Sequence, residues 1–508
     1  MKKLLWSFPL YVLLLPLFFV LHHNNELFGF IAFHQSAAAF GLCVLYLVIW
    51  TVLFYLFNRS LDRSAFIAFL IGIYTLYFGD YLDFLKSVFG HSFFSSYKFV
   101  VPFSVIVMVL VSKYQAGNGD RIQKVKVYLN VVMILFVFIE VISSIVYFIE
   151  TPSHHNLIYP LKPISSNYRP SEKKLNEKPD IYFIVFDAYT NATTLKKLWK
   201  FNNRPIETWL EENGFYIADS SKSNYNFTPF SIASTLNMDY LNPKWGAKGN
   251  VPEFELRAVR SMSENETISL LKKEDYQVRY FTPFESNIED IGLYHEFSDF
   301  GSKEFYRQTF PNRFKLDVLW NFVSGKFNFG IKPNRKIEEH PLYKNYVQRA
   351  NDIETTINKL KETADSSSNR RPQFAYAHFL ITHQPHLFDS TGNLRKGLDL
   401  ISQRNLFETY THQVMYANRV ITELVEWIKL HNKKNTIIII EGDHGFRDFP
   451  PSMDSFHFPN LNAIYFPDKD YNRFYPQLSP VNTFRIVFNH YFGQNLPLLK
   501  DSCIFVKF

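Results

Sequence analysis

The chain has 508 residues, too many for one ordinary hydrophobic core, so we expect two or more structural units. Its formal net charge of +7 is modest for this length, and no block of Lys and Arg indicates a nucleic-acid partner. The two cysteines, Cys43 and Cys503, do not indicate a disulfide framework, and neither lies near the chemistry predicted below, which excludes a cysteine-derived nucleophile.

Apolar residues are concentrated in the first third of the chain. Several apolar segments approach the roughly 20 residues that cross a bilayer as a helix. The five segments are 4–21, 37–57, 64–85, 99–112 and 127–148. The fourth is the shortest, and the first is expected to be retained because no small-residue cleavage site follows it. Asp80 and Asp83, in the third segment, either lie near the membrane interface or line a polar substrate path.

Basic residues alternate between the loops that join these segments. Lys2 and Lys3 precede the first segment, and more Lys and Arg lie between the second and third and between the fourth and fifth. By the positive-inside rule, the N-terminus is cytoplasmic and five spans place everything after about residue 150 outside. We therefore predict a transmembrane helical domain over 1–150, a Pro-rich linker over 151–178 and an extracytoplasmic domain over 179–508.

Strand-like and helical patterns alternate in the last two thirds of the chain. Strands are predicted within 179–187, 277–281, 373–381, 436–442 and, after a loop, 456–466. Helical patterns follow Asp187 as far as about residue 213 and cover 406–430, whereas no element is predicted for about 285–345. This alternation predicts an α/β fold with a doubly wound parallel or mixed sheet.

Two predicted strands end in potential metal ligands. Asp187 follows the first strand, and Asp443 and His444 follow a strand of four isoleucines. One such aspartate is often only a helix cap. Two together, with an imidazole beside the second, favour a metal site, because chemistry in parallel sheets gathers at the carboxyl ends of the strands. Carboxylate and imidazole ligands suit zinc or manganese.

A threonine begins the helical pattern that follows these first elements. Thr228 precedes Pro229, which is the arrangement of a capping residue followed by proline in the first turn. The same geometry suits a nucleophile, because free backbone N–H groups and the positive end of the helix dipole favour an alkoxide and an anionic phosphate. The sequence leaves both interpretations open.

Taken together, the order of these motifs resembles the alkaline phosphatase/sulfatase superfamily over about residues 179–492. With several apolar segments ahead of the domain, the chain is most similar to the membrane-bound sulfatase-like group, which includes the lipoteichoic acid synthases and the lipid A phosphoethanolamine transferases. The motifs that carry the resemblance are Asp187, Thr228, His383-Gln384-Pro385-His386, Asp443-His444-Gly445 and His457.

The resemblance implies roles for these residues. The metal ligands it implies are Asp187, Thr228, Asp443 and His444. Thr228 also matches the nucleophile, and His383 matches a histidine that contacts the substrate or assists the leaving group. His457 matches a histidine of that role or of a second metal site, so one Zn or Mn ion is expected and a second is possible. His378 and His386 suit packing or loop hydrogen bonds as well as a functional role.

The chain departs from true sulfatases in two respects. Thr228-Pro229-Phe230-Ser231 stands where sulfatases have a Cys/Ser-x-Pro-x-Arg motif, and Asp187 is followed by Ala188 instead of a second carboxylate. Both departures favour phosphoryl chemistry over sulfate esters. Ser231 and Ser234 are alternative nucleophiles that point less naturally at the metal, and Asn226-Phe227-Thr228 is treated as a chance glycosylation sequon. Arg447 either offsets charge on the phosphate or is an ordinary surface residue.

We expect a multi-pass membrane enzyme with an extracytoplasmic catalytic domain, periplasmic if the membrane is a Gram-negative inner membrane. It would transfer a phosphoethanolamine- or phosphoglycerol-type group from a membrane phospholipid donor to an envelope lipid or glycan acceptor through a phospho-threonine. The alternatives are a sulfatase-like hydrolase of phosphate mono- or diesters or of sulfate esters, and a catalytically inactive binding module.

Overall fold

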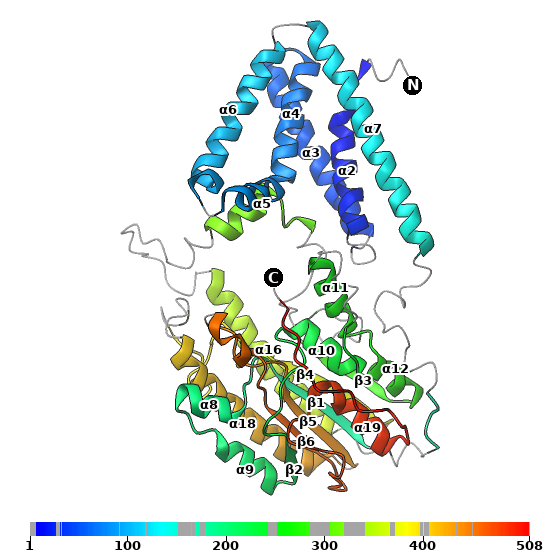
Figure 1. Cartoon of the computed structure of the whole chain (residues 1–508), viewed down its shortest axis with the longest axis vertical. Coiled ribbons are helices and arrows are strands. Elements are labelled where there is room, and N and C mark those ends of the chain that lie inside the picture. Colours follow the sequence, from blue (N-terminus) through cyan, green and yellow to red (C-terminus); the bar gives the residue numbers. More distant parts are fainter. Residues whose placement is uncertain are drawn as a thin grey trace. The chain divides into compact units, whose positions relative to one another are not determined.

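The computed structural model divides the chain into two compact units (Figure 1). The first comprises Met1–Asn156 and Asp299–Phe329, and the second comprises Leu157–Ser298 and Gly330–Phe508. The structure describes residues 7–26, 31, 33–90, 92–116, 119–150, 164, 168–172, 178–241, 251–284, 288, 305–319, 341–365, 371–396, 400, 406–432, 435–449 and 451–506.

The first unit consists of apolar helices. They are α2 (Tyr11–Glu26), α3 (Phe33–Asn58), α4 (Leu61–Leu76), α5 (Phe78–Phe89), α6 (Tyr97–Ala116) and α7 (Gly119–Glu150), with a 3-10 turn η1 (Phe93–Ser95). Among the described residues, α3, α6 and α7 are each long and apolar enough to cross a membrane, and α4 with α5 makes a fourth if the bent pair is one span. Most side chains of these three helices are not buried, as expected where lipid is the solvent.

The helices differ from the five predicted spans in two places. The third predicted span is not one helix, because α4 and α5 meet at 62° with Tyr77 between them. α2 has 16 residues, which is short for a span, and residues 4–6 of the first predicted segment lie outside the described residues. By contrast, the segment predicted to be shortest forms the 20-residue helix α6. The predicted orientation stays a prediction.

A segment from the later part of the chain belongs to this helical unit. It contains α14 (Phe310–Phe314) and a π-helical turn, η5 (Lys315–Leu319). The Arg313 guanidinium lies 2.5 Å from Asp83 Oδ1, and the Gly79 N–H donates to the Gln308 carbonyl oxygen at 2.7 Å. This segment falls in the region for which no element was predicted, and it differs from the predicted domain boundaries, which place it in the second unit.

The second unit contains a mixed six-stranded sheet in the order β2-β6-β5-β1-β4-β3 (Figure 1). The strands are β1 (Asp180–Phe186), β2 (Phe215–Ile217), β3 (Gln277–Phe281), β4 (Gln373–Phe379), β5 (Thr436–Gly442) and β6 (Asn462–Tyr465). The four strands β3, β4, β1 and β5 are parallel, whereas β6 is antiparallel to both β5 and β2. The predicted α/β fold is confirmed, and of the described strands the short β2 was not predicted.

Helices cover both faces of this sheet (Figure 1). They are α8 (Ala192–Trp199), α9 (Arg204–Glu212), α10 (Thr228–Asn237), α11 (Val251–Ser261), α12 (Glu266–Lys273), α16 (Pro341–Asp365), α18 (Leu406–His431) and α19 (Thr483–Tyr491), with 3-10 turns η8 (Pro451–His457) and η9 (Pro480–Asn482). Alternate residues of β1 face opposite layers. Tyr182 and Ile184 join the core cluster with α16 and α18, whereas Phe183 packs edge-on against Phe484 of α19 at 5.3 Å between ring centroids.

Some elements around the sheet differ from the prediction. The single helical stretch predicted after Asp187 is two helices, because Lys200 has a left-handed φ of 56° that ends α8. Part of the predicted linker is tied to the second unit: the Tyr168 hydroxyl donates to Glu274 Oε1 at 2.6 Å, and the Ser171 N–H donates to the same oxygen at 2.7 Å. Most of residues 151–178 lie outside the described residues.

One buried carboxyl on the central sheet predicts a pH dependence of stability. Burial raises the pKa of Glu441, on β5, from 4.5 to about 8, although the Thr483 hydroxyl donates a hydrogen bond to it. Because the folded state binds this proton more tightly than the unfolded state, wild-type stability should fall as pH rises from about 4.5 through 8. Glu441→Gln mimics the protonated form, so its advantage in melting temperature over wild type should grow across this window. Parallel melting curves would contradict the assignment.

Candidate metal centre

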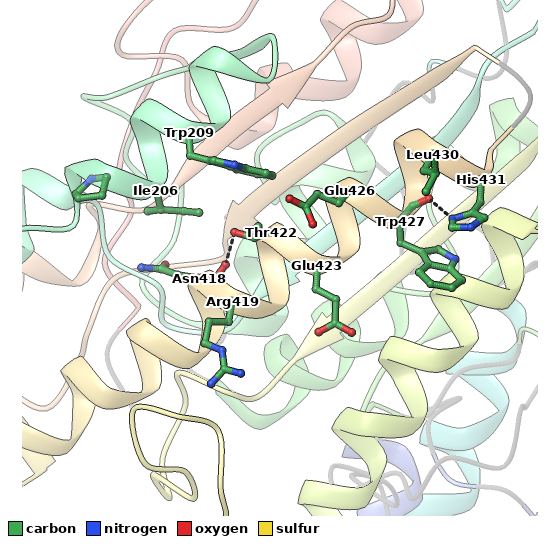
Figure 2. A pocket seen from close by; sticks show the side chains of 11 residues that line it. Ile206, Trp209, Asn418, Arg419, Thr422, Glu423, Glu426, Trp427, Leu430 and His431 are labelled. Atoms are coloured by element: carbon green, nitrogen blue, oxygen red, sulfur yellow. Dashed lines mark hydrogen bonds between the residues drawn. The ribbon is translucent and has the colours of Figure 1, made fainter.

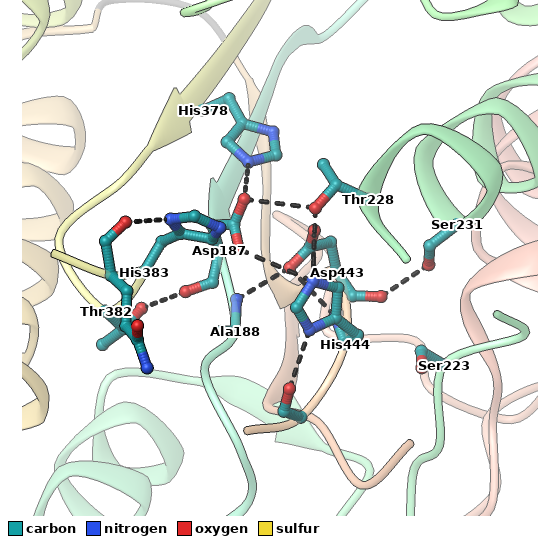
Figure 3. A network of polar contacts seen from close by, with 12 residues as sticks. Asp187, Ala188, Ser223, Thr228, Ser231, His378, Thr382, His383, Asp443 and His444 are labelled. Carbon is teal, nitrogen blue, oxygen red and sulfur yellow. Dashed lines mark hydrogen bonds and ion pairs between the residues drawn. The ribbon is translucent and has the colours of Figure 1, made fainter. Parts of the chain in front are cut away.

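The parallel pairing of β1 and β5 brings two aspartates to one edge of the sheet. Phe186 pairs with Gly442, so Asp187 and Asp443 leave neighbouring strand ends side by side (Figure 3). Asp187, Asp443 and His444 are all buried, and each offers a ligand atom within 4.8 Å of the others. These three residues are therefore brought together as the sequence predicted, and the group could bind a metal ion.

Close backbone contacts hold the two strand ends together. A Cβ on Gly442 would lie 2.2 Å from the Tyr189 carbonyl oxygen, so only glycine fits there. Ala188 has φ of 59°, a left-handed conformation that is unfavourable for alanine, and this conformation directs its N–H to Asp443 Oδ1 at 2.9 Å. The strained residue thus orients the neighbouring carboxylate.

Each of the two aspartates has one carboxylate oxygen without a hydrogen-bond partner. Asp443 Oδ1 accepts hydrogen bonds from the backbone N–H groups of Ala188 and His444, both at 2.9 Å. Asp443 Oδ2 and Asp187 Oδ1 are buried without a hydrogen-bond partner. Since buried carboxylate oxygens without partners are costly, a cation between them would satisfy both, and the residues present fit a divalent metal ion.

His444 is oriented as a metal ligand. Its Nδ1 lies 2.7 Å from the Gly445 carbonyl oxygen, an acceptor, so Nδ1 carries the proton and Nε2 has a free lone pair. Nε2 lies 3.6 Å from Asp187 Oδ1 and 3.5 Å from Asp443 Oδ2. Burial, with Arg447 nearby, holds the pKa of His444 well below its usual value, which keeps the ring neutral as coordination requires.

The two aspartates have different electrostatic surroundings. Burial alone would raise the pKa of Asp187, but the imidazoles of His383, His378 and His444 hold it below its usual value. Burial and the neighbouring Asp187 carboxylate raise the pKa of Asp443. Two carboxylates that repel each other in a buried site are a common arrangement for a bound cation.

Thr228 joins this group from the start of α10. Its hydroxyl donates to Asp187 Oδ2 at 3.2 Å and lies 3.2 Å from His444 Nε2 (Figure 3). The N-cap position is occupied by Phe227, which makes no side-chain cap hydrogen bond, so Thr228 does not act as the cap. Its hydroxyl instead points into the metal-binding group, as the functional interpretation of the sequence required.

His378 is part of the site, although the sequence left its role open. It lies on β4, which pairs with β1, and its Nε2 lies 3.2 Å from Asp187 Oδ2 (Figure 3). The Tyr376 hydroxyl lies 2.8 Å from His378 Nδ1. His378 and Thr228 thus meet the same carboxylate oxygen. His378 belongs to the site because its strand pairs with the strand that ends in Asp187. The sequence does not specify this strand order, so the role of His378 could not be predicted from it.

The other three histidines that the sequence analysis named occupy different surroundings. His386 is buried with its Nδ1 2.7 Å from the Thr409 hydroxyl, which matches the packing interpretation. His383 follows β4 and lies beside Asp187 in Figure 3, half-buried. His457 is buried, with the backbone of Arg447 beside its ring. Burial lowers the pKa of His457.

The alternative nucleophiles are engaged elsewhere. The Ser231 hydroxyl donates to the Asp443 carbonyl oxygen at 2.5 Å, and the Ser234 hydroxyl donates to the Asp239 carbonyl oxygen at 2.8 Å. Both hydroxyls therefore hold backbone carbonyls. Asn226 is buried with its amide on backbone groups of Val506, which is consistent with treating the sequon as chance.

Gly445 should be required for the turn that carries His444. A Cβ there would lie 2.6 Å from the Phe456 carbonyl oxygen and 2.7 Å from that of Pro459, neither of which can move freely. We expect Gly445→Ala to destabilise the second unit by about 2 kcal/mol and to weaken metal binding. Gly493→Ala is the control: it has positive φ but nothing within 4 Å, so it should lower the melting temperature less and leave metal content unchanged. Equal effects would contradict the steric argument.

A separate pocket of about 720 Å³ lies between α9 and α18 (Figure 2). Trp209 and Trp427 line it together with polar groups such as Arg419 and Glu423. None of its lining residues belongs to the metal-binding group, so the chemistry is assigned to the strand ends and not to this pocket.

Comparison with known protein families agrees with the resemblance. The sulfatase family model matches residues 220–491, which is more than half of the chain. No curated protein sequence matches.

Similar solved structures include the C-terminal periplasmic domain of EcEptC from Escherichia coli, at 13% identity and TM-score 0.40, covering 68% of this chain and 92% of that one. A second structure of that domain is a complex with Zn. The integral membrane lipooligosaccharide phosphoethanolamine transferase A from Neisseria meningitidis has 12% identity and TM-score 0.38, covering 96% of this chain and 95% of that one.

Proposed function

Because the chain belongs to the sulfatase family of the alkaline phosphatase superfamily, we propose that it is a metal-dependent transferase of phospho-substituents anchored in a membrane. The observation that carries the proposal is the Thr228 hydroxyl, which lies 3.2 Å from both Asp187 Oδ2 and His444 Nε2 within the metal-binding group. A hydroxyl in that position is a nucleophile for phosphorus.

Asp187, Asp443, His444 and Thr228 would hold the metal ion, Zn or Mn. When bound, such an ion supplies Lewis acidity that lowers the pKa of a hydroxyl and offsets charge on phosphate oxygens. The chain itself keeps Thr228 in place, because Asp187 Oδ2 accepts its hydrogen bond and α10 begins at this residue. His378 shares that oxygen and would hold the carboxylate in one orientation.

Transfer would take place in two balanced steps. Thr228 Oγ1 loses its proton and forms a bond to phosphorus, while the bond from phosphorus to the leaving alcohol oxygen breaks and that oxygen takes a proton. This leaves a phospho-threonine. The hydroxyl of an acceptor then loses its proton and attacks the same phosphorus, and the Thr228 oxygen leaves and is protonated again.

The two histidines that the family resemblance assigned to proton transfer would take these roles. His383 lies beside Asp187 and would donate a proton to the leaving alcohol (Figure 3). Burial lowers the pKa of His457, so its neutral ring would accept the proton of the incoming acceptor hydroxyl. Arg447 contributes positive charge near this edge of the site.

The apolar helices suggest the source of the substrate. A chain anchored by several membrane helices meets lipid head groups at high local concentration, so we infer a phospholipid donor and an envelope lipid or glycan acceptor. The transferred group would be of the phosphoethanolamine or phosphoglycerol type. The catalytic unit would lie outside the cytoplasm, in the periplasm if the membrane is a Gram-negative inner membrane.

The test is to trap the covalent intermediate. The purified full chain in proteoliposomes would be mixed with phosphatidylethanolamine, and separately with phosphatidylglycerol, then quenched in acid for peptide mass spectrometry. We expect one of the two lipids to add its phospho-substituent to the peptide containing Thr228 and to release diacylglycerol. Modification at another residue, or none with either lipid, would contradict the proposed transferase.

The hydrolase alternatives are distinguished by the fate of the product. If diacylglycerol release runs at full rate without an acceptor and liberates the free phospho-substituent, the protein is a phosphodiester hydrolase. Hydrolysis of p-nitrophenyl sulfate is not expected, because sulfatases use a formylglycine made from Cys or Ser, and Thr228 occupies that place. An inactive binding module would give neither product.

A further inference from the structure

The last residues that the structure describes run beside the candidate site. We call Ser502–Val506 the C-terminal strap. It forms a parallel bridge with the segment before Thr228: the Ile504 N–H donates to the Asn224 carbonyl oxygen at 2.9 Å. The Asn226 side chain pairs with Val506 in both directions, donating at 3.1 Å and accepting at 2.7 Å.

Polar side chains also fix the beginning of the strap. Asp501 Oδ1 accepts hydrogen bonds from the Ser479 hydroxyl at 2.5 Å and from the Tyr475 hydroxyl at 3.1 Å. The Ser502 N–H donates to the Tyr240 hydroxyl at 2.9 Å, and the Tyr240 hydroxyl donates to the Lys500 carbonyl oxygen at 2.8 Å. The strap is therefore held at both ends by specific hydrogen bonds.

The strap contacts the site at two places. Asn226, which binds Val506, is two residues before Thr228 in the chain. The Phe505 ring stacks on His457, with ring centroids 5.7 Å apart and an interplanar angle of 24°. The His457 carbonyl oxygen in turn accepts a hydrogen bond from the Gly445 N–H at 2.6 Å, so Phe505 is linked to the turn that carries His444.

Two large apolar side chains remain exposed on this anchored strap. Ile504 is 40% exposed and Phe505 is 42% exposed, although the backbone around them is hydrogen-bonded. Nearby, the Arg447 guanidinium lies 4.8 Å from the centroid of the Phe227 ring, next to Thr228. This edge of the site thus combines a cation with an exposed apolar surface, which is the combination that an alkyl phosphodiester requires.

We propose that Ile504 and Phe505 bind the alkyl part of a lipid phosphodiester and so make the C-terminal strap a specificity determinant. The inference rests on the proposed function, because it assumes a phosphodiester at Thr228. The strap would favour esters with an apolar substituent over small soluble ones, while the attack on phosphorus would not depend on it.

The test compares two phosphodiesters that differ only in the leaving alcohol, the methyl and the hexyl ester of the phospho-substituent that the donor lipid carries. In both, Thr228 Oγ1 bonds to phosphorus while the bond to the methyl or hexyl alcohol oxygen breaks, and that oxygen takes a proton and leaves as methanol or hexanol, which is measured. We expect wild type to prefer the hexyl ester and Phe505→Ala to lower the hexyl-to-methyl ratio of kcat/KM by about fivefold, chiefly through KM. Hydrolysis of the methyl ester should stay near wild type, and Phe505→Leu should restore the ratio.

Leu498→Ala is the matched control, because Leu498 is 41% exposed on the same terminal segment but outside the strap. It should leave the ratio unchanged. If wild type hydrolyses both esters without preference, or if Phe505→Ala slows both equally, the strap is not a specificity element and Phe505 only supports His457. If wild type hydrolyses neither ester, the proposed function fails and the inference fails with it. Melting temperatures of all variants would show whether they fold.

Discussion

Replacing the Thr228 hydroxyl should abolish turnover and leave the fold intact. Thr228→Val keeps the shape of the side chain but removes the oxygen that lies 3.2 Å from Asp187 Oδ2 and His444 Nε2. We expect kcat on a phosphodiester substrate to fall by about a thousandfold or more, because a covalent mechanism has no substitute for its nucleophile. The melting temperature should change little, since the valine methyl groups fill the same space.

Thr235→Val is the control for this substitution. Thr235 is buried in the same helix, and its hydroxyl donates to the Ser231 carbonyl oxygen at 3.0 Å, away from the metal-binding group. It should retain nearly full turnover. Thr228→Ser, which keeps a hydroxyl, should keep measurable activity. Near-wild-type turnover by Thr228→Val would show that another residue, or an activated water, attacks phosphorus.

Loss of Asp443 should have the second large effect, on metal binding and stability together. In wild type, Zn or Mn at 100 times its dissociation constant should stabilise the folded state by about 2.7 kcal/mol. For a unit the size of the second one, the melting temperature should then rise by roughly 4 °C. Asp443→Asn should bind metal at least about 100-fold more weakly, because it removes a direct ligand, and should show no such rise.

The metal-free proteins should behave differently from the metal-loaded ones. Without metal, Asp443→Asn should be as stable as wild type or more stable, because the amide relieves the repulsion between two buried carboxylates. Asp219→Asn, at an exposed position of the same unit, is the control and should bind metal like wild type. Mass spectrometry of the metal content tests the loss of binding, and melting curves in the presence of a chelator test the stability without metal. Metal retained by Asp443→Asn would mean that the site lies elsewhere.

The sequence by itself determined the central part of this site. The apolar strands ending in Asp187 and in Asp443-His444 predict neighbouring ligands, because strands of a parallel sheet present their carboxyl ends at one edge. The Thr-Pro step at Thr228 predicts a helix start with a hydroxyl beside the free backbone N–H groups. Both patterns lie within a few neighbouring residues and imply one local geometry. The positions of these side chains could therefore be predicted without knowledge of the tertiary structure.

The tertiary structure alone decided which distant residues complete the site. His378 reaches Asp187 because β4 is the neighbour of β1, and no local pattern specifies strand order. The segment with Arg313 joins the helical unit, and the strap with Phe505 reaches His457, through contacts between residues far apart in the chain. Local periodicity determines which face of an element is apolar, but the partner of that face depends on packing of the whole chain.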